Sequence, residues 1–363
     1  GFDRQHLPMH LAAGHGMIWG SIRDPLPVLP YRERPRMIGP TVGPGESSYT
    51  RFDRAVAESA VEWLADAAKQ PSGRPWALFV GFVAPHFPLI APPEFAALYP
   101  TEQMRRPKLR PETGYRRHAW LQAMHDYWPH DDGFLDDDER MRAIAMYHAL
   151  CSAMDANVGR VLDAVQNGPL AANTRVIYTS DHGDNLGARR LWNKGTLYRE
   201  STGVPMVIAG PGVSRGHRCE TNVSLLDLYP SLVEAATGQL PQAPLPGGSL
   251  WSIGAAPDDP GRLAFSEYHA VGSPSGAFLV ADGRHVYHHY VGYPPALFDW
   301  RADPRERNDL AGDPAHVTTL ERMKGALYAI VDPDAADRAA KQDQDRLVAR
   351  FGGREAALNR GVR

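Results

Sequence analysis

The sequence predicts an α/β fold in which helices flank a large mixed, mostly parallel sheet, followed by a small antiparallel sheet with one helix. Two observations support this fold class. Between residues 52 and 238, apolar runs of strand length alternate with segments of helical periodicity, the pattern of a parallel sheet covered on both faces. Beyond the Pro- and Gly-rich stretch at 240–250, short apolar runs are joined by tight turns, which is typical of an antiparallel sheet.

The first half of the chain is expected to begin irregularly and then to alternate helix and strand. Residues 1–50 are rich in Pro, Gly and Arg, which predicts an irregular segment. Helical spacing of apolar residues predicts helices over 52–64 and 141–165. The continuous apolar run at 74–89 predicts a buried strand that ends in a Pro-His-x-Pro loop. The aromatic and charged stretch at 100–138 is expected to form a loop that covers a site.

Two more strands and a helix complete the predicted large domain. The stretches "TRVIYTS" at 174–180 and "GVPMVIAGPG" at 203–212 predict strands. Residues 222–238 predict an amphipathic helix that stops at Gly238. We therefore expect a large α/β domain over residues 1–255.

The remaining chain predicts a small α+β subdomain over residues 256–332. Its Asp282-Gly283 pair is a hairpin signal, and a helix is expected near 314–331. The charged, helix-prone residues 333–363 are expected to form a tail that meets solvent or another subunit, and so could mediate homo-oligomerisation. Short strands are expected at 263–270, 276–291 and 295–300.

Composition excludes several classes of protein. The net charge of −3 over 363 residues gives no electrostatic reason to expect nucleic acid or an anionic membrane as partner. No apolar run approaches the roughly 20 residues of a membrane-spanning helix. Cys151 and Cys219 are too few for a disulfide framework and lack metal-ligand spacing. This low cysteine content is compatible with the cytoplasm without requiring it, and a cytoplasmic location is expected in preference to a periplasmic one.

Asp181 and His182 are candidate metal ligands because they directly follow a predicted buried strand. In open α/β sheets, ligands bind beyond the carboxyl ends of the strands, and a carboxylate beside an imidazole can share one divalent ion. The alternative is a hydrogen-bonded Asp-x-Gly turn with no ligand.

Lys194 and His86 are candidate anion-binding residues. Lys194 lies in a Gly- and Asn-rich loop after Trp192, which could limit its hydration and strengthen its attraction for a sulfate or phosphate oxygen. His86 lies between Pro85 and Pro88 at the end of another predicted strand, where a rigid loop suits a hydrogen-bond donor. The alternatives are a solvated lysine and a structural histidine.

Together these segments resemble the sulfatase branch of the alkaline phosphatase superfamily, in family order over most of residues 75–315. The stretch that contains Asp181 is the most specific. The last stretch resembles the family's C-terminal Leu-Phe-Asp…Asp-Pro-x-Glu…Asn-Leu signature, with Asn308 followed by an additional Asp309. The matching stretches are "VAPHFPL", "YHALCSAMDANVGRVLDAV", "VIYTSDHGDNLGARRLWNKGTLYRESTGVPMVIAGPG", "VSLLDLYPSLVEAATG" and "ALFDWRADPRERNDLAGDP".

The resemblance implies an alkaline-phosphatase-like sandwich and a role for each candidate residue. Asp181 and His182 correspond to the family's second pair of metal ligands. Lys194 corresponds to the lysine that contacts ester oxygen and nucleophile, and His86 to the histidine that binds the anionic group. An Asp-His pair is more similar to choline sulfatases and phosphonate monoester hydrolases than to many arylsulfatases, which have Asn at the second position. The imidazole favours manganese, zinc or iron relative to calcium as the single divalent ion.

One part of the family pattern has no counterpart in this sequence. The family begins with a strand that ends in two acidic ligands, followed by a Cys/Ser-x-Pro-x-Arg motif whose first residue becomes the formylglycine nucleophile. Cys151 and Cys219 lack the following proline and arginine, so both are interpreted as structural. We expect the formylglycine in an N-terminal portion that this chain lacks, so that this chain alone holds no nucleophile.

The resemblance implies metal-dependent hydrolysis of a small sulfate ester by the complete protein. The alternatives are a phosphonate monoester or phosphodiester hydrolase, since these esters also carry one negative charge, and a noncatalytic binding or scaffold protein. His269 and Trp192 are candidate contacts for the leaving group. Residues Trp120, Tyr127 and Trp128 could cage a quaternary ammonium such as choline or could instead anchor their loop.

Overall fold

A computed structural model describes residues 3–7, 38–39, 42–69, 73–127, 129–270 and 272–359. Most of the predicted irregular segment at 1–50 lies outside these residues.

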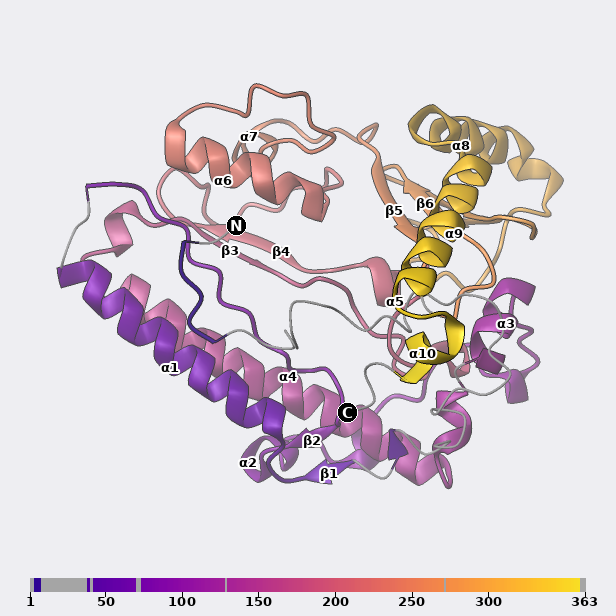
Figure 1. Cartoon of the computed structure of the whole chain (residues 1–363), viewed down its shortest axis with the longest axis horizontal. Helices are drawn as coiled ribbons and strands as arrows, with labels where there is room; N and C mark the ends of the chain where they lie inside the picture. The colour runs from indigo at the N-terminus through magenta and orange to yellow at the C-terminus, as the bar shows by residue number, and fades with distance from the viewer. Residues whose placement is uncertain are drawn as a thin grey trace.

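The first layer consists of the helices α1 (Ser48–Lys69) and α4 (Asp137–Gln166), which run side by side (Figure 1). Apolar residues at helical spacing bury one face of each helix, as predicted. The short strands β1 (Gly43–Pro44) and β2 (Ile90–Ala91) pair in parallel near one end of α4.

The middle layer is a strand pair, and it lies between the two long helices and the helices α6 and α7 (Figure 1). Strands β3 (Val176–Thr179) and β4 (Met206–Ala209) pair antiparallel in the register Val176↔Ala209. Helix α6 (Leu228–Thr237) ends at Gly238 in the left-handed conformation, as predicted, and α7 spans Leu250–Ala255. The α/β class with helices on both faces of the strands is therefore confirmed.

Two predictions about the strands of the large domain are wrong in detail. The β3–β4 pair is antiparallel rather than parallel, because the connection at 180–205 turns back beyond the strand ends instead of crossing a sheet face. Among the described residues, the apolar run at 74–89 forms no strand of its own. Its last residue, Leu89, accepts a hydrogen bond of 3.0 Å from Gly43 N–H of β1, and its Phe79 is 76% exposed. The backbone N–H groups of Val83 and Ala84 donate to the Asp53 carboxylate on α1 instead of to a neighbouring strand.

The C-terminal part forms the predicted antiparallel sheet, in the order β5-β6-β7-β8. The Asp282-Gly283 hairpin is confirmed, with Asp282 Oδ1 accepting hydrogen bonds from the N–H groups of Arg284 at 2.8 Å and His285 at 2.6 Å. Helix α8 (Val317–Ile330) packs Met323 and Leu327 on one face of the sheet. The strands are β5 (Ala264–Tyr268), β6 (Ala277–Ala281), β7 (His285–Tyr290) and β8 (Ala296–Asp299).

The stretch at 100–138 is more ordered than the predicted loop. Its helix α3 (Ala119–Tyr127) packs Trp120 and Leu121 against the other face of the small sheet. These apolar side chains drive the helix into the core. The remaining short helices are α2 (Pro93–Ala96), α5 (Arg199–Thr202) and the 3₁₀ turns Thr101–Gln103, Pro111–Thr113, His130–Gly133, Ala171–Asn173, Ala188–Arg190, Leu225–Asp227 and Pro314–His316.

The tail forms helices α9 (Pro333–Arg350) and α10 (Arg354–Asn359). Asp337 Oδ1 accepts a hydrogen bond of 2.7 Å from Gly276 N–H, and Gln344 donates one of 2.7 Å to the carbonyl of His269. The tail therefore binds the small sheet instead of extending into solvent. Its role in oligomerisation, like the domain boundaries, stays a prediction.

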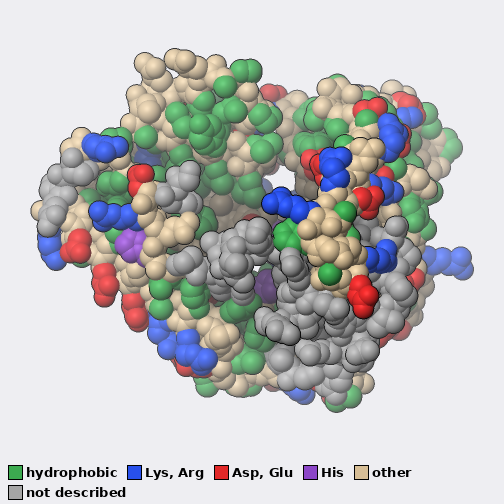
Figure 2. Space-filling view, viewed as in Figure 1, with side chains coloured by type: hydrophobic (Ala, Val, Ile, Leu, Met, Phe, Trp, Pro, Cys, Tyr) green, Lys and Arg blue, Asp and Glu red, His purple; other side chains and the backbone are tan. Residues whose placement is uncertain are grey.

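The surface over α6 and α7 exposes hydrophobic side chains (Figure 2). Leu226, Tyr229 and Leu232 are 50%, 61% and 46% exposed. Within the described part of the chain, no helix has both the length and the apolar character needed to cross a membrane.

Candidate active site

The segment directly after β3 presents Asp181 and His182 side by side. Their side chains are 82% and 32% exposed, and Asp181 Oδ1 accepts a hydrogen bond of 2.9 Å from the N–H of His182. Gly183 turns the chain against α5, where its N–H donates to Ser201 O at 2.7 Å. A Cβ at Gly183 would overlap with the carbonyl oxygen of Glu200. Glycine is therefore required at this position for steric reasons, and the two preceding side chains remain accessible.

The ring of His182 is oriented by the backbone. Its Nδ1 lies 2.8 Å from the carbonyl oxygen of Gly183, and because a carbonyl only accepts, Nδ1 carries the hydrogen and Nε2 is left with its lone pair. Nε2 lies 3.4 Å from Asp181 Oδ2. Two donors bound at about 2.1 Å to one ion, at bond angles of roughly 90–110°, are about 3.0–3.4 Å apart. The pair thus has the spacing of two ligands that share one ion.

Asp184 and Asn185 hold the loop that carries Lys194, here called the lysine loop, against this segment. Asp184 Oδ1 accepts hydrogen bonds from the N–H groups of Leu186 at 2.8 Å and Asn193 at 3.0 Å. The N–H and the Nδ2 of Asn185 both donate to Asn193 O, at 2.8 and 2.6 Å. Three of these four bonds involve Asn193, and since Lys194 directly follows it, they fix the origin of the lysine side chain.

His86 is positioned by a carboxylate on α1. Asp53, which is 1% exposed, accepts hydrogen bonds from the N–H groups of Val83 at 2.8 Å and Ala84 at 2.9 Å. The next turn is closed by a bond of 3.0 Å from His86 N–H to Val83 O. His86 Nδ1 lies 2.7 Å from Phe87 O, so this ring also carries its hydrogen on Nδ1 and leaves Nε2 for a ligand.

The charges of these groups influence one another's pKa values. Burial lowers the pKa of His86, the positive charges of Lys194 and His182 lower it further, and the carboxylate of Asp181 raises it. Loss of hydration lowers the pKa of Lys194, whereas the negative charges of Asp181 and Asp184 raise it. Because charge interactions weaken with distance and screening, these effects indicate that the loops of His86, His182 and Lys194 lie within electrostatic range of one another. A shared role of the four predicted residues stays a prediction.

A family model described as sulfatase matches residues 27–238, which is more than half of the chain. The chain belongs to the sulfatase family. The fold and the solved structures that resemble it place this sulfatase chain in the alkaline phosphatase superfamily. Sulfatases generally use a divalent metal ion and a formylglycine nucleophile.

This sulfatase chain is similar to three proteins of known name or structure. Arylsulfatase K from Xenopus laevis is 28% identical over 79% of this chain and 58% of its own length. Choline-sulfatase from Rhizobium meliloti is 30% identical over 85% of this chain and 62% of its own length. The structure of a phosphonate monoester hydrolase from Silicibacter pomeroyi is 26% identical, with a TM-score of 0.64 over 76% of this chain and 59% of that one. The chain thus spans about six tenths of the length of the curated relatives.

The donor set of this sulfatase chain fits part of a divalent-metal site. Asp181 supplies a carboxylate oxygen and His182 an imidazole nitrogen whose lone pair is available. In the described portion of the chain, no group of three or more His, Cys, Asp or Glu side chains is arranged to hold a metal ion. Asp181 and His182 would therefore account for two ligands of such a site.

The two candidate substrate contacts have other partners. Trp192 is 5% exposed and its Nε1 donates to Asp131 Oδ1 at 2.8 Å, so it is a core residue rather than a surface for substrate. His269 Nε2 lies 3.1 Å from Glu267 Oε2, and its contact with substrate stays a prediction. Among the described residues, Tyr268 and Met124 both reach the loop that carries Lys194, because a Cβ at Gly195 would lie 3.1 Å from the Tyr268 hydroxyl and 3.1 Å from the Met124 methyl group.

The predicted aromatic cage is not present in the described residues. Trp120 is 0% exposed and donates from Nε1 to Ser275 O at 3.2 Å, and Tyr127 is 6% exposed. Trp128 lies outside the described residues. The aromatic side chains of this segment anchor α3 in the core, which is the alternative that the sequence left open.

Both cysteines have structural surroundings. Cys151 lies within α4, and burial raises the pKa of its thiol to about 11, which suppresses the nucleophilic thiolate. The Cys219 thiol lies 3.9 Å from Ile253 O. The structural interpretation of Cys151 is thereby supported.

A buried charge network behind the site could not be recognised from the sequence. Arg189 is 0% exposed, donates to Glu200 at 3.2 Å and to Glu306 O at 2.8 Å, and lies 3.3 Å above the Tyr198 ring. Glu306 also accepts from Trp300 Nε1 at 2.8 Å. The network fastens the C-terminal signature to the loop after β3. Glu306 belongs to that signature, whereas nothing in the sequence distinguishes Arg189 from neighbouring arginines.

Proposed function

We propose that this chain contributes the anion-binding residues and two metal ligands of a sulfuric ester hydrolase. The joint position of Lys194, His86, Asp181 and His182 carries the proposal. The relatives named arylsulfatase K and choline-sulfatase support small-molecule sulfate esters as the substrate class. Since the chain spans about six tenths of their length, the nucleophile is not assigned to any of its residues.

Each residue has a role that follows from its position. Lys194 supplies a positive charge for the sulfuryl and leaving-group oxygens, where charge develops in the transition state. His86 presents Nε2 to another sulfuryl oxygen, because its Nδ1 is bonded to Phe87 O. Both groups are held by backbone hydrogen bonds of their loops, so little reorganisation is needed during reaction.

Asp181 and His182 would hold a divalent ion, which supplies Lewis-acid activation of the nucleophile. The imidazole nitrogen favours manganese or zinc over calcium, which prefers oxygen ligands. The carbonyl of Gly183 fixes the His182 ring with Nε2 free, a common arrangement for a metal-binding histidine.

Substitution with matched controls tests this proposal. In the full-length protein, Lys194→Ala is expected to lower kcat/KM for an aryl sulfate by about 10²–10³-fold, and Lys69→Ala, whose side chain is 72% exposed on α1, should have no effect. Asp181→Asn should lower metal affinity about tenfold or more. The control Asp66→Asn removes a carboxylate of similar exposure, 78%. Equal effects in test and control variants would refute the assignment.

A phosphonate monoester hydrolase is the second candidate. The phosphonate monoester hydrolase structure with a TM-score of 0.64 supports it, and both substrate classes present a single negative charge to Lys194 and His86. The two candidates are distinguished by kcat/KM of the full-length protein for matched aryl sulfate and aryl phosphonate monoesters. A large preference for the phosphonate would replace the sulfatase assignment.

A noncatalytic binding protein is the remaining alternative. It predicts that the full-length protein binds neither manganese nor zinc, whether or not it binds inorganic sulfate. Metal analysis therefore separates this alternative from both enzymes.

A further inference from the structure

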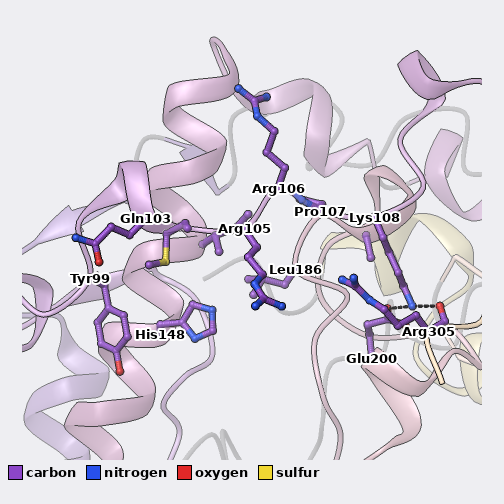
Figure 3. A pocket seen from close by; sticks show the side chains of 13 residues that line it. Tyr99, Gln103, Arg105, Arg106, Pro107, Lys108, His148, Leu186, Glu200 and Arg305 are labelled. Carbon is purple, nitrogen blue, oxygen red and sulfur yellow. Dashed lines mark hydrogen bonds and ion pairs between the residues drawn. The ribbon is translucent and has the colours of Figure 1, made fainter.

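A cavity of about 340 Å³ lies beside the loop that follows the candidate metal ligands (Figure 3). Its wall combines the segment after the Thr101–Gln103 turn, one face of α4, the loop before Arg189, and residue 305 of the C-terminal signature. The lining residues are Tyr99, Gln103, Met104, Arg105, Arg106, Pro107, Lys108, Ile144, His148, Leu186, Ala188, Glu200 and Arg305.

The cavity has an excess of positive charge. Glu200 is the one acidic side chain among the described residues that line it, and this carboxylate already pairs with Lys108 and with the buried Arg189. Within the described part of the chain, neither the Arg105 nor the Arg305 guanidinium has a carboxylate at ion-pair distance. Two cations that share one cavity without a counter-charge favour the binding of an anion.

The directions of the arginine side chains agree with this distribution of charge. Figure 3 shows Arg105 and Arg305 extending into the space between His148 and Glu200, whereas Arg106 extends away from it. Arg106 pairs with Asp137 on α4. Of the three arginines, two therefore remain available to a ligand.

The opposite wall is apolar and suits the face of a ring. Tyr99 and His148 stack with centroids 5.7 Å apart and an interplanar angle of 24°. The Tyr99 hydroxyl is fixed by a hydrogen bond of 2.7 Å with Ser152. Met104 and Leu186 continue this wall.

The cavity adjoins the segment that carries the candidate metal ligands. Leu186 lies four residues after His182, so their Cα atoms are at most about 14 Å apart. Glu200 lines the cavity, and its carbonyl oxygen contacts Gly183. The two sites therefore meet across a single loop.

We propose that this cavity binds a second oxyanion, a carboxylate, sulfate or sulfonate, on the leaving group of the ester. The preferred substrates would be ring compounds with at least two negative charges, one at the reacting ester and one at Arg105 and Arg305. This inference rests on the proposed function, and it adds a substrate class to it.

Isosteric aryl sulfates test the inference in the full-length protein. One probe carries a terminal carboxylate and its partner a terminal carboxamide of the same shape, each on a phenyl and on a biphenyl spacer. We expect kcat/KM to be about tenfold higher for the carboxylate than for the carboxamide on at least one spacer, as two partly exposed ion pairs would give. A sulfonate on the same spacer distinguishes carboxylate from sulfur oxyanions.

Substitutions of the arginines test whether the preference for the carboxylate probe arises in this cavity. The double variant that combines Arg105→Gln and Arg305→Gln should bring the ratio close to one without changing kcat/KM for the carboxamide. Arg106→Gln removes an adjacent cation that points away, and it should leave the ratio unchanged.

Three outcomes would overturn the inference in distinguishable ways. A ratio near one in the unsubstituted protein, with the carboxamide probes hydrolysed, would refute the second oxyanion site alone. Absence of hydrolysis for every sulfate probe would refute the proposed function and the inference with it. A tenfold preference that persists in the double variant would place the second anion elsewhere.

Discussion

Asp184 is expected to be the residue that keeps Lys194 in position. Its Oδ1 accepts hydrogen bonds from Leu186 N–H at 2.8 Å and Asn193 N–H at 3.0 Å. Burial raises the pKa of this carboxyl, although the two hydrogen bonds lower it. Asp184→Ala would leave two backbone donors without their acceptor. Each such loss costs about 1–3 kcal/mol, and recovered solvation of the loop offsets part of it. We therefore predict a decrease of about 2–3 kcal/mol in the free energy of unfolding.

Urea denaturation of the full-length protein measures this loss of stability. Two further variants show whether the loss comes from the Asp184 carboxylate. Asp184→Asn keeps an acceptor oxygen but no charge, so it should cost about half as much as alanine. In metal-free protein, Asp181→Ala, at an 82% exposed side chain, should change stability by less than about 0.5 kcal/mol. If Asp184→Ala costs no more than Asp181→Ala, the carboxylate does not organise the loop.

Three other predictions concern the backbone, the charges and the thiol. Gly183→Ala should lower the free energy of unfolding by about 2–4 kcal/mol, because its Cβ would overlap with Glu200 O. Gly159→Ala on α4, where a Cβ meets nothing within 4 Å, should be neutral or stabilising in the same urea titration; similar losses in both would exclude a steric cause. Lys194→Met should raise the pKa of His86 measured by NMR, because the lysine charge lowers it; an unchanged pKa would mean that the two groups lie far apart. Alkylation of Cys151 at pH 8 should be about 100-fold slower than that of a free thiol, as follows from its pKa of about 11, and fast alkylation would contradict its burial.

Local patterns in the sequence account for most helices and for the small sheet. The apolar spacing along α4 predicts its buried face, and the Asp282-Gly283 pair predicts the β6–β7 hairpin, because both signals reside in neighbouring residues. The run at 74–89 has the composition of a buried strand, but strand formation also requires a partner across the ladder, which composition does not specify.

The same distinction applies to the site. Asp181 and His182 are recognisable because they follow a strand within one motif. Asp53 and Arg189 are not, because a charged residue on a helix or in a loop is most often solvated. Their burial at 1% and 0% exposure depends on segments distant in sequence, with Asp53 bound to Val83 and Arg189 to Glu306.

A crystal structure of the full-length protein soaked with zinc and sulfate tests the central claim most directly. Anomalous scattering should locate one zinc ion about 2.0–2.2 Å from an Asp181 oxygen and from His182 Nε2. A sulfate ion should lie within hydrogen-bond distance of both Lys194 Nζ and His86 Nε2. Zinc bound away from the Asp181–His182 pair, or sulfate that contacts neither Lys194 nor His86, would contradict the proposed site.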